Sequence, residues 1–196
     1  MQVDALSGGF TNPPIQSAHA FRHVMGAMAR PGTILDIESA APPAPLSKAA
    51  GSVLLTLCDT DTPVYLAGAV DCEAVRAWLA FHTGAPLAGA PDCMFAVGSW
   101  EALVPLSSYP IGTPDYPDRS ATLIVECTEL AQSGATLTGP GIKTHAMLNV
   151  PDPQALQENN ALFPLGLDFI FTAGSALAAL PRSTQVSVLG RRVEAL

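Results

Sequence analysis

Short apolar runs that alternate with helical stretches limit this chain to folds in which helices cover a sheet. Residues 120–130, SATLIVECTEL, are rich in β-branched side chains and predict the clearest strand. Residues 64–68 (VYLAG) and 93–99 (CMFAVGS) predict further short, buried strands. Helical patterns occur between and around these runs, so the order of elements predicts an α/β or α+β fold.

The first predicted helix covers residues 15–30, where apolar side chains recur at the three- and four-residue spacing of an amphipathic helix. Pro31 and Gly32 are expected to end it. The proline-rich residues 40–46 predict a loop. The spaced apolar residues of this helix are Ile15, Ala18, Phe21, Met25 and Met28.

Later helices are predicted from apolar runs and from residues that favour a helix start. Residues 47–59 form a strongly apolar helical run. Asp71 is predicted to cap a helix at residues 72–82, and Asp152 a helix at residues 153–163.

The C-terminal half alternates predicted strands with a weaker helical pattern. Residues 135–139 are predicted to pair with the strand at residues 120–130 across a short turn. Residues 142–151 form a weak helical pattern. Strands or a hairpin are predicted at residues 166–174 and 176–189.

Length and charge limit the organisation and the partners of the chain. No internal repeat or linker divides residues 1–196, so one domain is expected, with residues 1–14 as a poorly ordered N-terminal segment. The net charge of −8 disfavours nucleic acid and anionic membranes as partners. No apolar run reaches the ~18–20 residues that span a bilayer, and the N-terminus lacks a secretory-signal pattern. We therefore expect a cytoplasmic protein that docks onto other proteins.

The segment ATLTGPGIKTH at residues 135–145 raises the question of a phosphate-binding glycine loop. A Walker loop needs four residues between its glycines, because backbone N–H groups must surround the phosphates. Here Pro140 removes one N–H group, and Lys143 does not directly follow the second glycine. Gly139, Pro140 and Gly141 are therefore predicted to form a structural turn, and the dinucleotide pattern GxGxxG is not met.

Side chains that commonly carry chemistry lack the partners that such chemistry needs. His19 and His23 have a spacing that can bind a metal, but no third ligand accompanies them, so solvated helix surface is the favoured interpretation. Neither Lys48 nor Lys143 lies in a setting typical of a Schiff-base lysine. The cysteines show no CxxC spacing and are expected to be buried thiols. No metal, no cofactor and no catalytic residue is therefore predicted.

The arginines leave two interpretations open. In the first they converge on an anion site, because guanidinium groups match phosphate or phosphonate oxygens; in the second they form ordinary surface pairs. The arginines in question are Arg22, Arg30, Arg76, Arg119 and Arg182.

Motifs in a fixed order cover most of residues 15–188 and resemble one family. They are FRHVMGAMARPG (Phe21–Gly32), SVLLTLCDTDTPV (Ser52–Val64), FHTGAP (Phe81–Pro86), SATLIVEC (Ser120–Cys127), LTGPGI (Leu137–Ile142), FPLGLDFIFT (Phe163–Thr172) and LPRSTQVSV (Leu180–Val188). In this order they resemble the PhnH family, the H subunits of the bacterial carbon–phosphorus lyase system.

The resemblance implies both a fold and a role. The implied fold is α/β, a three-layer α/β/α sandwich like the large domain of type I pyridoxal-phosphate (PLP) transferases, without the Schiff-base lysine and without PLP. The implied partners are a second copy of the chain, as a homodimer, and the G, I and J subunits of a core complex. With G, I and the ATPase-like L protein, the family is required for transfer of ribose triphosphate from ATP to an alkylphosphonate, with release of adenine. The J subunit later cleaves the C–P bond.

No catalytic residue is established for these subunits, so none is assigned and no activity of the chain alone is expected. Residues inside the motifs are candidates for a docking or pocket surface, namely Phe81, His82 and Arg182, and also Arg22 and Arg30. Two other functions stay open: an independent small transferase that binds an anionic ligand, and a degenerate PLP protein.

Overall fold

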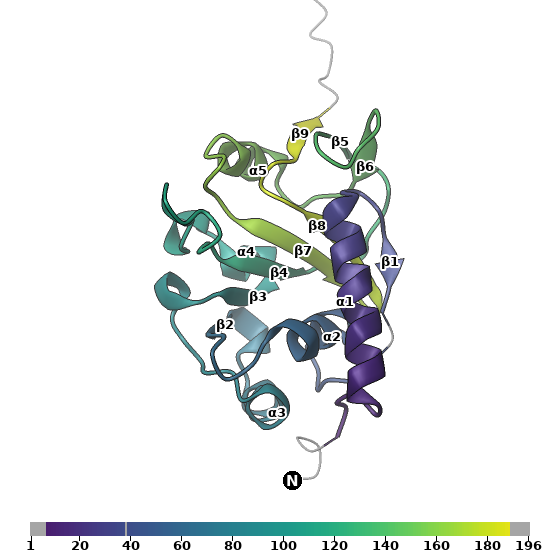
Figure 1. Ribbon diagram of the computed structural model, residues 1–196, viewed down its shortest axis with the longest axis vertical. Coiled ribbons are helices and arrows are strands. Elements are labelled where there is room, and N and C mark those ends of the chain that lie inside the picture. Colours follow the sequence, from purple (N-terminus) through teal and green to yellow (C-terminus); the bar gives the residue numbers. More distant parts are fainter. Residues whose placement is uncertain (1–6, 38, 189–196) are drawn as a thin grey trace, which may run out of the picture.

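A central sheet contains six strands: β1 (Leu35–Asp36), β2 (Val64–Leu66), β3 (Phe95–Ser99), β4 (Thr122–Glu126), β7 (Asp168–Ala173) and β8 (Ala176–Leu180). The computed structural model describes residues 7–37 and 39–188. The strand order is β1-β8-β7-β4-β3-β2, as Figure 1 shows. β2, β3, β4 and β7 are parallel to their neighbours in this group, whereas β8 is antiparallel to both β7 and β1. The predicted mixed α/β fold is confirmed.

The middle of this sheet is buried on both faces, which explains its nearly unbroken apolar strands. Residues 123–125 of β4 are fully buried, and Ile124 lies opposite Ile170 of β7. Parallel strands covered on both faces characteristically have this composition. β2, β3 and β4 confirm the three strands predicted in this part of the sequence.

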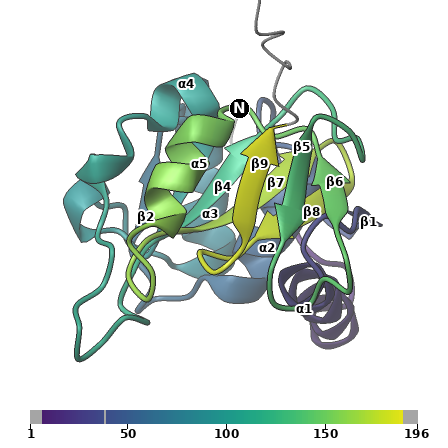
Figure 2. The ribbon, with the colours of Figure 1, turned by 90° about the horizontal axis from the view of Figure 1, so that it is seen from above.

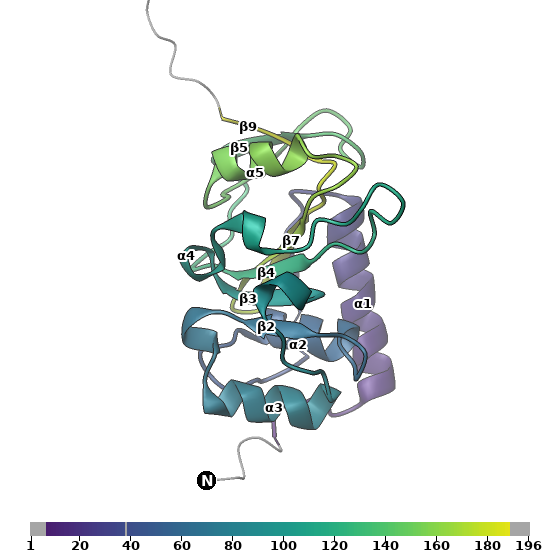
Figure 3. The ribbon, with the colours of Figure 1, turned by 90° about the vertical axis from the view of Figure 1, so that its left-hand side faces the viewer.

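The helices α1 (Pro13–Ala29), α2 (Lys48–Leu57) and α3 (Glu73–Thr83) cover one face of the sheet (Figures 1 and 3). The hydroxyl of Ser47 caps α2 by accepting a hydrogen bond from the backbone N–H of Ala50 at 3.1 Å. Leu54 and Trp78 from this layer are fully buried against the sheet. No helix in the described part of the chain is long and apolar enough to cross a membrane.

The opposite face is covered by α4 (Trp100–Leu103), α5 (Pro153–Asn160) and a second sheet (Figure 2). This antiparallel sheet has the order β6-β5-β9, with β5 (Ala135–Thr138), β6 (Ala146–Leu148) and β9 (Gln185–Val188). Asp152 caps α5 as predicted, by accepting from the backbone N–H of Ala155 at 3.1 Å. Short 3₁₀ helices lie at Gly68–Val70, Ala90–Asp92 and Leu106–Ser108. The outer layer on this face is therefore part helix and part sheet.

The predicted pairing of residues 135–139 with residues 120–130 is wrong. β4 lies between β3 and β7 in the central sheet, whereas β5 pairs with β6 and β9 in the second sheet. Both strands have the local features of a hairpin, but β4 is satisfied on each side by a parallel neighbour. Strand partners depend on which faces are buried in the folded protein, and the local sequence does not encode that.

The weak helix predicted at residues 142–151 is also wrong. This segment contains β6, which pairs antiparallel with β5 in the register Leu137↔Ala146. Pairing with β5 satisfies the backbone of a segment whose own helical pattern is weak, so the tertiary contact overrides local propensity.

Asp71 does not cap α3, which corrects a further prediction. Cys72 occupies the N-cap position and makes no side-chain capping bond. The carboxylate of Asp71 instead pairs with the guanidinium of Arg76, with an Nη2–Oδ2 distance of 2.7 Å. The ion pair occupies both carboxylate oxygens of Asp71, which would otherwise accept hydrogen bonds from backbone N–H groups in the first turn of α3.

α1 buries a different side from the one that carries its largest apolar residues. The buried residues are Ala20, Val24 and Ala27, all small. Their size lets α1 lie close to α2 and β8, because the separation of packed elements depends on the side chains between them. The larger residues of the predicted apolar spacing, such as Phe21 and Met25, are exposed.

Of the N-terminal segment at residues 1–14, residues 1–6 lie outside the described part. The backbone carbonyl of Ser7 accepts from Nε1 of Trp78 at 3.1 Å, and that of Gly8 accepts from the N–H of Ala41 at 2.8 Å. Pro13 then begins α1. Residues 7 and 8 are thus attached to the helical layer.

Candidate functional site

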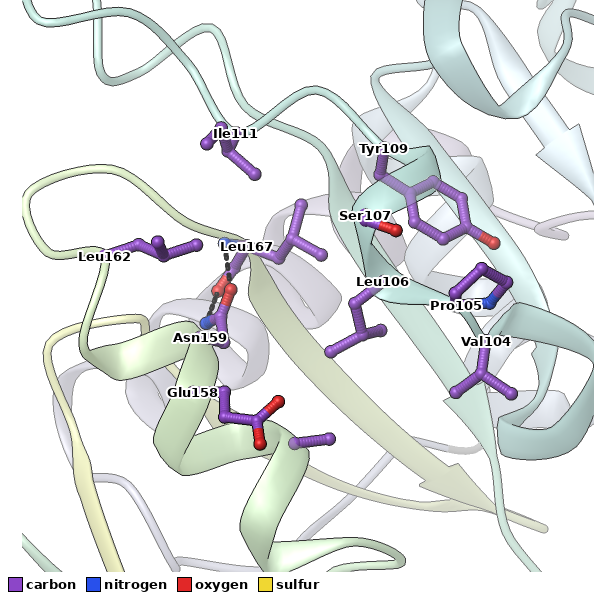
Figure 4. A pocket seen from close by; sticks show the side chains of 11 residues that line it. Val104, Pro105, Leu106, Ser107, Tyr109, Ile111, Glu158, Asn159, Leu162 and Leu167 are labelled. Atoms are coloured by element: carbon purple, nitrogen blue, oxygen red, sulfur yellow. Dashed lines mark hydrogen bonds between the residues drawn. The ribbon is translucent and has the colours of Figure 1, made fainter.

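A cleft with a volume of about 580 Å³ lies between residues 104–111 and α5 (Figure 4). Its walls are mainly apolar. They include Val104, Leu106, Tyr109, Ile111, Leu162 and Leu167. This lining favours an apolar group as occupant.

The polar groups of this cleft do not form an anion site. The amide of Asn159 is used internally, since its Oδ1 accepts from the N–H of Leu167 at 2.8 Å and its Nδ2 donates to the carbonyl of Leu167 at 2.9 Å. Glu158 adds a carboxylate, and neither arginine nor lysine is among the residues that line the cleft. Burial raises the pKa of Tyr109 above its ordinary value, so its phenol stays neutral. A phosphonate or triphosphate would meet no compensating charge here.

A second cleft of about 410 Å³ lies beside Met94 and Arg119. Asp92 and Asp118 line it together with this single arginine. The guanidinium carbon of Arg119 lies 4.2 Å from the ring centre of Tyr116, in a cation–π contact. The two carboxylates exceed the one cation, so this cleft does not favour an anion either.

The carboxyl end of β4, where α/β sheets commonly bind ligands, contains an internal hydrogen-bond network. Glu126 accepts from the backbone N–H of Ser47 at 2.7 Å and from the hydroxyl of Thr172 at 3.0 Å. Because Ser47 is the N-cap of α2, the carboxylate of Glu126 lies where a phosphate could otherwise bind the helix N-terminus. Burial raises the pKa of Glu126, and the hydrogen bonds from Ser47 and Thr172 oppose this rise.

Arg182 follows β8 and is held inside the protein. Its Nη2 contacts Oδ2 of Asp168 at 2.5 Å, and its Nε donates to Oδ1 at 3.2 Å. Its Nη1 donates to the carbonyl of Pro117 at 2.6 Å, and Nη2 also donates to the hydroxyl of Ser120. The guanidinium therefore ties the loop before β4 to the start of β7.

His82 lies in the last turn of α3 beneath the N-terminal segment. Its ring centre is 5.2 Å from that of Trp78 and 4.9 Å from that of Phe81, and Nε2 lies 3.3 Å from the carbonyl oxygen of Ser7. A side chain at Gly9 would bring a Cβ atom within 2.6 Å of Nδ1 of His82, so the segment passes directly over the ring. Phe81 itself is exposed.

The predicted site residues do not gather in one place. His82 is on α3, whereas Arg182 lies in the connection between β8 and β9 and contacts Asp168 at the start of β7. In Figure 1, α3 and β9 lie at opposite ends of the molecule. Arg22 is exposed on α1, and Arg30 is exposed where α1 ends. The arginines therefore do not converge on one anion.

Gly139, Pro140 and Gly141 lie in the connection between β5 and β6. The N–H of Ile142 donates to the carbonyl of Gly139 at 3.2 Å, and the φ angles of Gly139 and Gly141 are +128° and +81°. A Cβ atom on Gly141 would overlap the carbonyl oxygen of Ala29, the last residue of α1. Glycine is required here for its conformation and for the close approach to α1.

Of the four cysteines expected to be buried, Cys58 and Cys93 are buried, whereas Cys72 and Cys127 are only partly buried. Nδ1 of His23 lies 2.7 Å from the carbonyl oxygen of His19. Burial raises the pKa of Cys58 to about 12 and that of Cys127 to about 11, which suppresses their thiolates. Within residues 7–37 and 39–188, no group of three or more His, Cys, Asp or Glu side chains could hold a metal. Lys48 is exposed, as is the lysine of the β5–β6 connection.

Comparison with known proteins identifies the family of the chain. A family model described as "Bacterial phosphonate metabolism protein (PhnH)" matches residues 8–187. The chain belongs to the PhnH family. It is 42% identical to the subunit PhnH of the alpha-D-ribose 1-methylphosphonate 5-triphosphate synthase of Rhizobium meliloti (strain 1021), with 94% of this chain and 97% of that protein covered.

A second relative, less similar in sequence, is the putative C-P lyase subunit protein HtxG of Stutzerimonas stutzeri. It is 29% identical over 177 residues, which cover 87% of this chain and 86% of HtxG. The ordered motifs of the sequence thus identified the family correctly.

Sequence reasoning did not find the apolar cleft beside α5 or the position of Glu126. The cleft is formed by segments about 50 residues apart, at residues 104–111 and 155–167, and no local pattern links them. One sequence feature indicates an internal role for Glu126: a carboxylate at the end of a buried apolar strand must find hydrogen-bond donors in the fold.

Proposed function

We propose that this chain is the PhnH subunit of an alpha-D-ribose 1-methylphosphonate 5-triphosphate synthase in phosphonate catabolism, and that it has no activity alone. The observation that carries the proposal is the 42% identity to the Rhizobium meliloti subunit over nearly the full length of both chains. The match of the family model to residues 8–187 supports a single PhnH domain.

The charges of the clefts support an accessory role. Transfer of ribose triphosphate from ATP to an alkylphosphonate requires several cations around two anionic reactants. The two clefts described above contain three carboxylates, those of Glu158, Asp92 and Asp118, and one arginine, Arg119. Other subunits are therefore proposed to supply the residues that hold ATP and the phosphonate.

The proposed partners are those that the family resemblance implies. The chain is proposed to form a homodimer in isolation and to join the G, I and J subunits in a core complex, acting with the ATPase-like L protein. The proposed location is the cytoplasm, where ATP is available.

We further propose that the fold is a variant of the large domain of type I PLP transferases that binds no PLP. Two observations support the loss of cofactor binding. Glu126 takes the N-terminus of α2, where a phosphate would be repelled by its carboxylate. Lys48 and Lys143 are exposed rather than enclosed in a pocket.

The docking residues proposed from the sequence act in different ways. Phe81, Arg22 and Arg30 are exposed and available to a partner. His82 is proposed to position Phe81, which it contacts edge-on. Arg182 is proposed to hold the loop before β4, since its guanidinium is engaged within the chain.

A complementation assay tests the proposed function. A strain that lacks its own PhnH but retains the other subunits should grow on methylphosphonate as sole phosphorus source when it expresses this chain. Tagged chain from those cells should retain the G, I and J subunits. Failure to restore growth, with soluble chain present, would refute the proposal.

Titration of the purified chain separates the alternatives. An independent transferase would bind ATP and methylphosphonate and release adenine without other subunits. A degenerate PLP protein would show an absorbance band of a lysine adduct that is lost on replacing Lys48 or Lys143. We expect neither signal.

A further inference from the structure

α1 has an apolar face that nothing in the described structure covers. Ile15, Phe21 and Met25 are 56%, 47% and 51% exposed. They recur at intervals that place them on one side of the helix, opposite the small residues packed on the sheet. We define the α1 face by the exposed residues on this side of the helix, which are Ile15, Ala18, His19, Phe21, Arg22, Met25 and Ala29.

The position of α1 makes this face accessible to a large partner. In Figures 1 and 3 the helix runs along the outside of the helical layer, beside β1 at the edge of the central sheet. A helix of 17 residues is about 25 Å long. Its outer side offers roughly 250 Å², about a third of what one partner buries in a stable complex. The contact must therefore extend beyond α1.

The charge around the α1 face is opposite to that of the whole chain. α1 contains no acidic residue, and Arg22 lies within the face. Arg30 follows α1, and the β5–β6 connection, which contains Lys143, packs through Gly141 against the carbonyl of Ala29. Ion pairs in the described ranges are Arg76–Asp71 and Arg182–Asp168 only, so these three cations have no ionic partner there.

We propose that the α1 face docks another subunit of the phosphonate-processing complex, through a partner surface that is apolar and bordered by carboxylates. The proposal rests on the proposed function. Apolar burial supplies the affinity, and Arg22, Arg30 and Lys143 orient a partner of opposite charge.

A second copy of the chain fits this face less well. In a two-fold pair of α1 helices whose symmetry axis passes near the middle of the helix, Arg22 lies beside Arg22 of the other copy. Like charges at the centre of a contact oppose association. A two-fold pair in which α1 of each copy contacts a different, acidic surface of the other copy would close into a dimer. The light-scattering measurement below distinguishes that arrangement from docking of another subunit.

A matched pair of variants tests the docking proposal. Met25→Asp places a charge in the α1 face, and Met94→Asp places the same charge on a methionine of similar exposure, 50% against 51%, far along the chain. Each tagged variant is co-expressed with the G, I and J subunits. Met25→Asp is expected to lower the recovered partner subunits at least tenfold, and Met94→Asp to leave them within twofold.

Charge is tested separately with Arg22→Glu and Arg22→Ala. Arg22→Glu is expected to lower partner recovery more than Arg22→Ala, with a difference that shrinks at 0.5 M salt because screening weakens the repulsion. Thermal melting within ~2 °C of the unchanged chain confirms that each variant folds, as expected for exposed sites.

The outcomes distinguish this proposal from the proposed function. In one outcome the unchanged chain recovers partner subunits and restores growth, and Met25→Asp recovers the same subunits equally well. This outcome overturns α1 docking and leaves the subunit role intact. Unchanged chain that recovers no partner and restores no growth overturns both. Light scattering measures self-association of the unchanged chain and of Met25→Asp. A dimer for the unchanged chain and a monomer for Met25→Asp would assign the α1 face to self-association and would also overturn the proposal.

Discussion

Replacement of Gly141 by alanine should destabilise the protein without acting through any nucleotide. The φ angle of Gly141 is +81°, a conformation that costs a residue with a Cβ atom about 1–2 kcal/mol. The added Cβ would overlap the carbonyl oxygen of Ala29 and lie 3.3 Å from Cδ of Pro31. Moving the β5–β6 turn away from the end of α1 adds about 1–3 kcal/mol. We expect a total loss of about 2–5 kcal/mol in the free energy of unfolding.

Gly174→Ala provides the matched control. Gly174 also has a positive φ angle, +60°, but a Cβ atom there would meet no heavy atom within 4 Å. This variant should lose only the conformational part, about 1–2 kcal/mol. The difference between the two variants therefore measures the close approach of the turn to α1.

Urea unfolding followed by circular dichroism measures both losses, and thermal melting gives a second estimate. For a chain of this size, 1 kcal/mol corresponds to a shift of about 2–4 °C in the melting temperature. Equal losses for Gly141→Ala and Gly174→Ala would refute the steric argument. A fully stable Gly141→Ala variant that lost measurable ATP binding of the unchanged chain would restore the phosphate-loop interpretation.

Three further predictions concern buried charges and thiols. Arg182→Ala should lower the free energy of unfolding by about 3–5 kcal/mol, since it leaves the largely buried carboxylate of Asp168 unpaired; urea unfolding measures this, and full stability would contradict the role of the ion pair. The folded state raises the pKa of Glu126 above the ordinary carboxyl value of 4.5, so the unchanged chain loses stability as the carboxyl ionises. The free energy of unfolding of Glu126→Gln should therefore rise relative to that of the unchanged chain as the pH increases above 4.5. A constant difference between the two free energies from pH 4 to pH 8 would argue against this. Cys58 and Cys127 should resist iodoacetamide at pH 8 until urea unfolds the chain, because burial raises the pKa of both thiols; rapid labelling of the native protein, located by mass spectrometry, would disprove this.

The elements that sequence patterns predicted correctly are those with strong local signals. α2 follows from its apolar run, α5 follows from the capping residue Asp152, and β4 follows from its β-branched run. The family also followed from local motifs in order, since such motifs keep their spacing along the chain. Each of these signals lies within a few neighbouring residues.

The candidate sites were less predictable because their residues meet only in the folded protein. Arg182 looked like a binding residue in its motif, but its role depends on Asp168, Pro117 and Ser120, which lie 14 to 65 positions away. The apolar face of α1 was visible as a spacing pattern, yet the pattern alone did not tell whether it faces the core or the solvent.

The sequence by itself determined the fold class, most helices and strands, the family, and the exclusion of a Walker loop at Gly139–Gly141. The tertiary structure alone decided that β5 leaves β4 for a second sheet, that Arg182 is enclosed, and that α1 buries Ala20, Val24 and Ala27 instead of its larger residues. Local patterns report which conformation a segment prefers and that it has an apolar side. The partner of that side is chosen by the competition among all apolar surfaces of the chain for burial, which no single segment encodes.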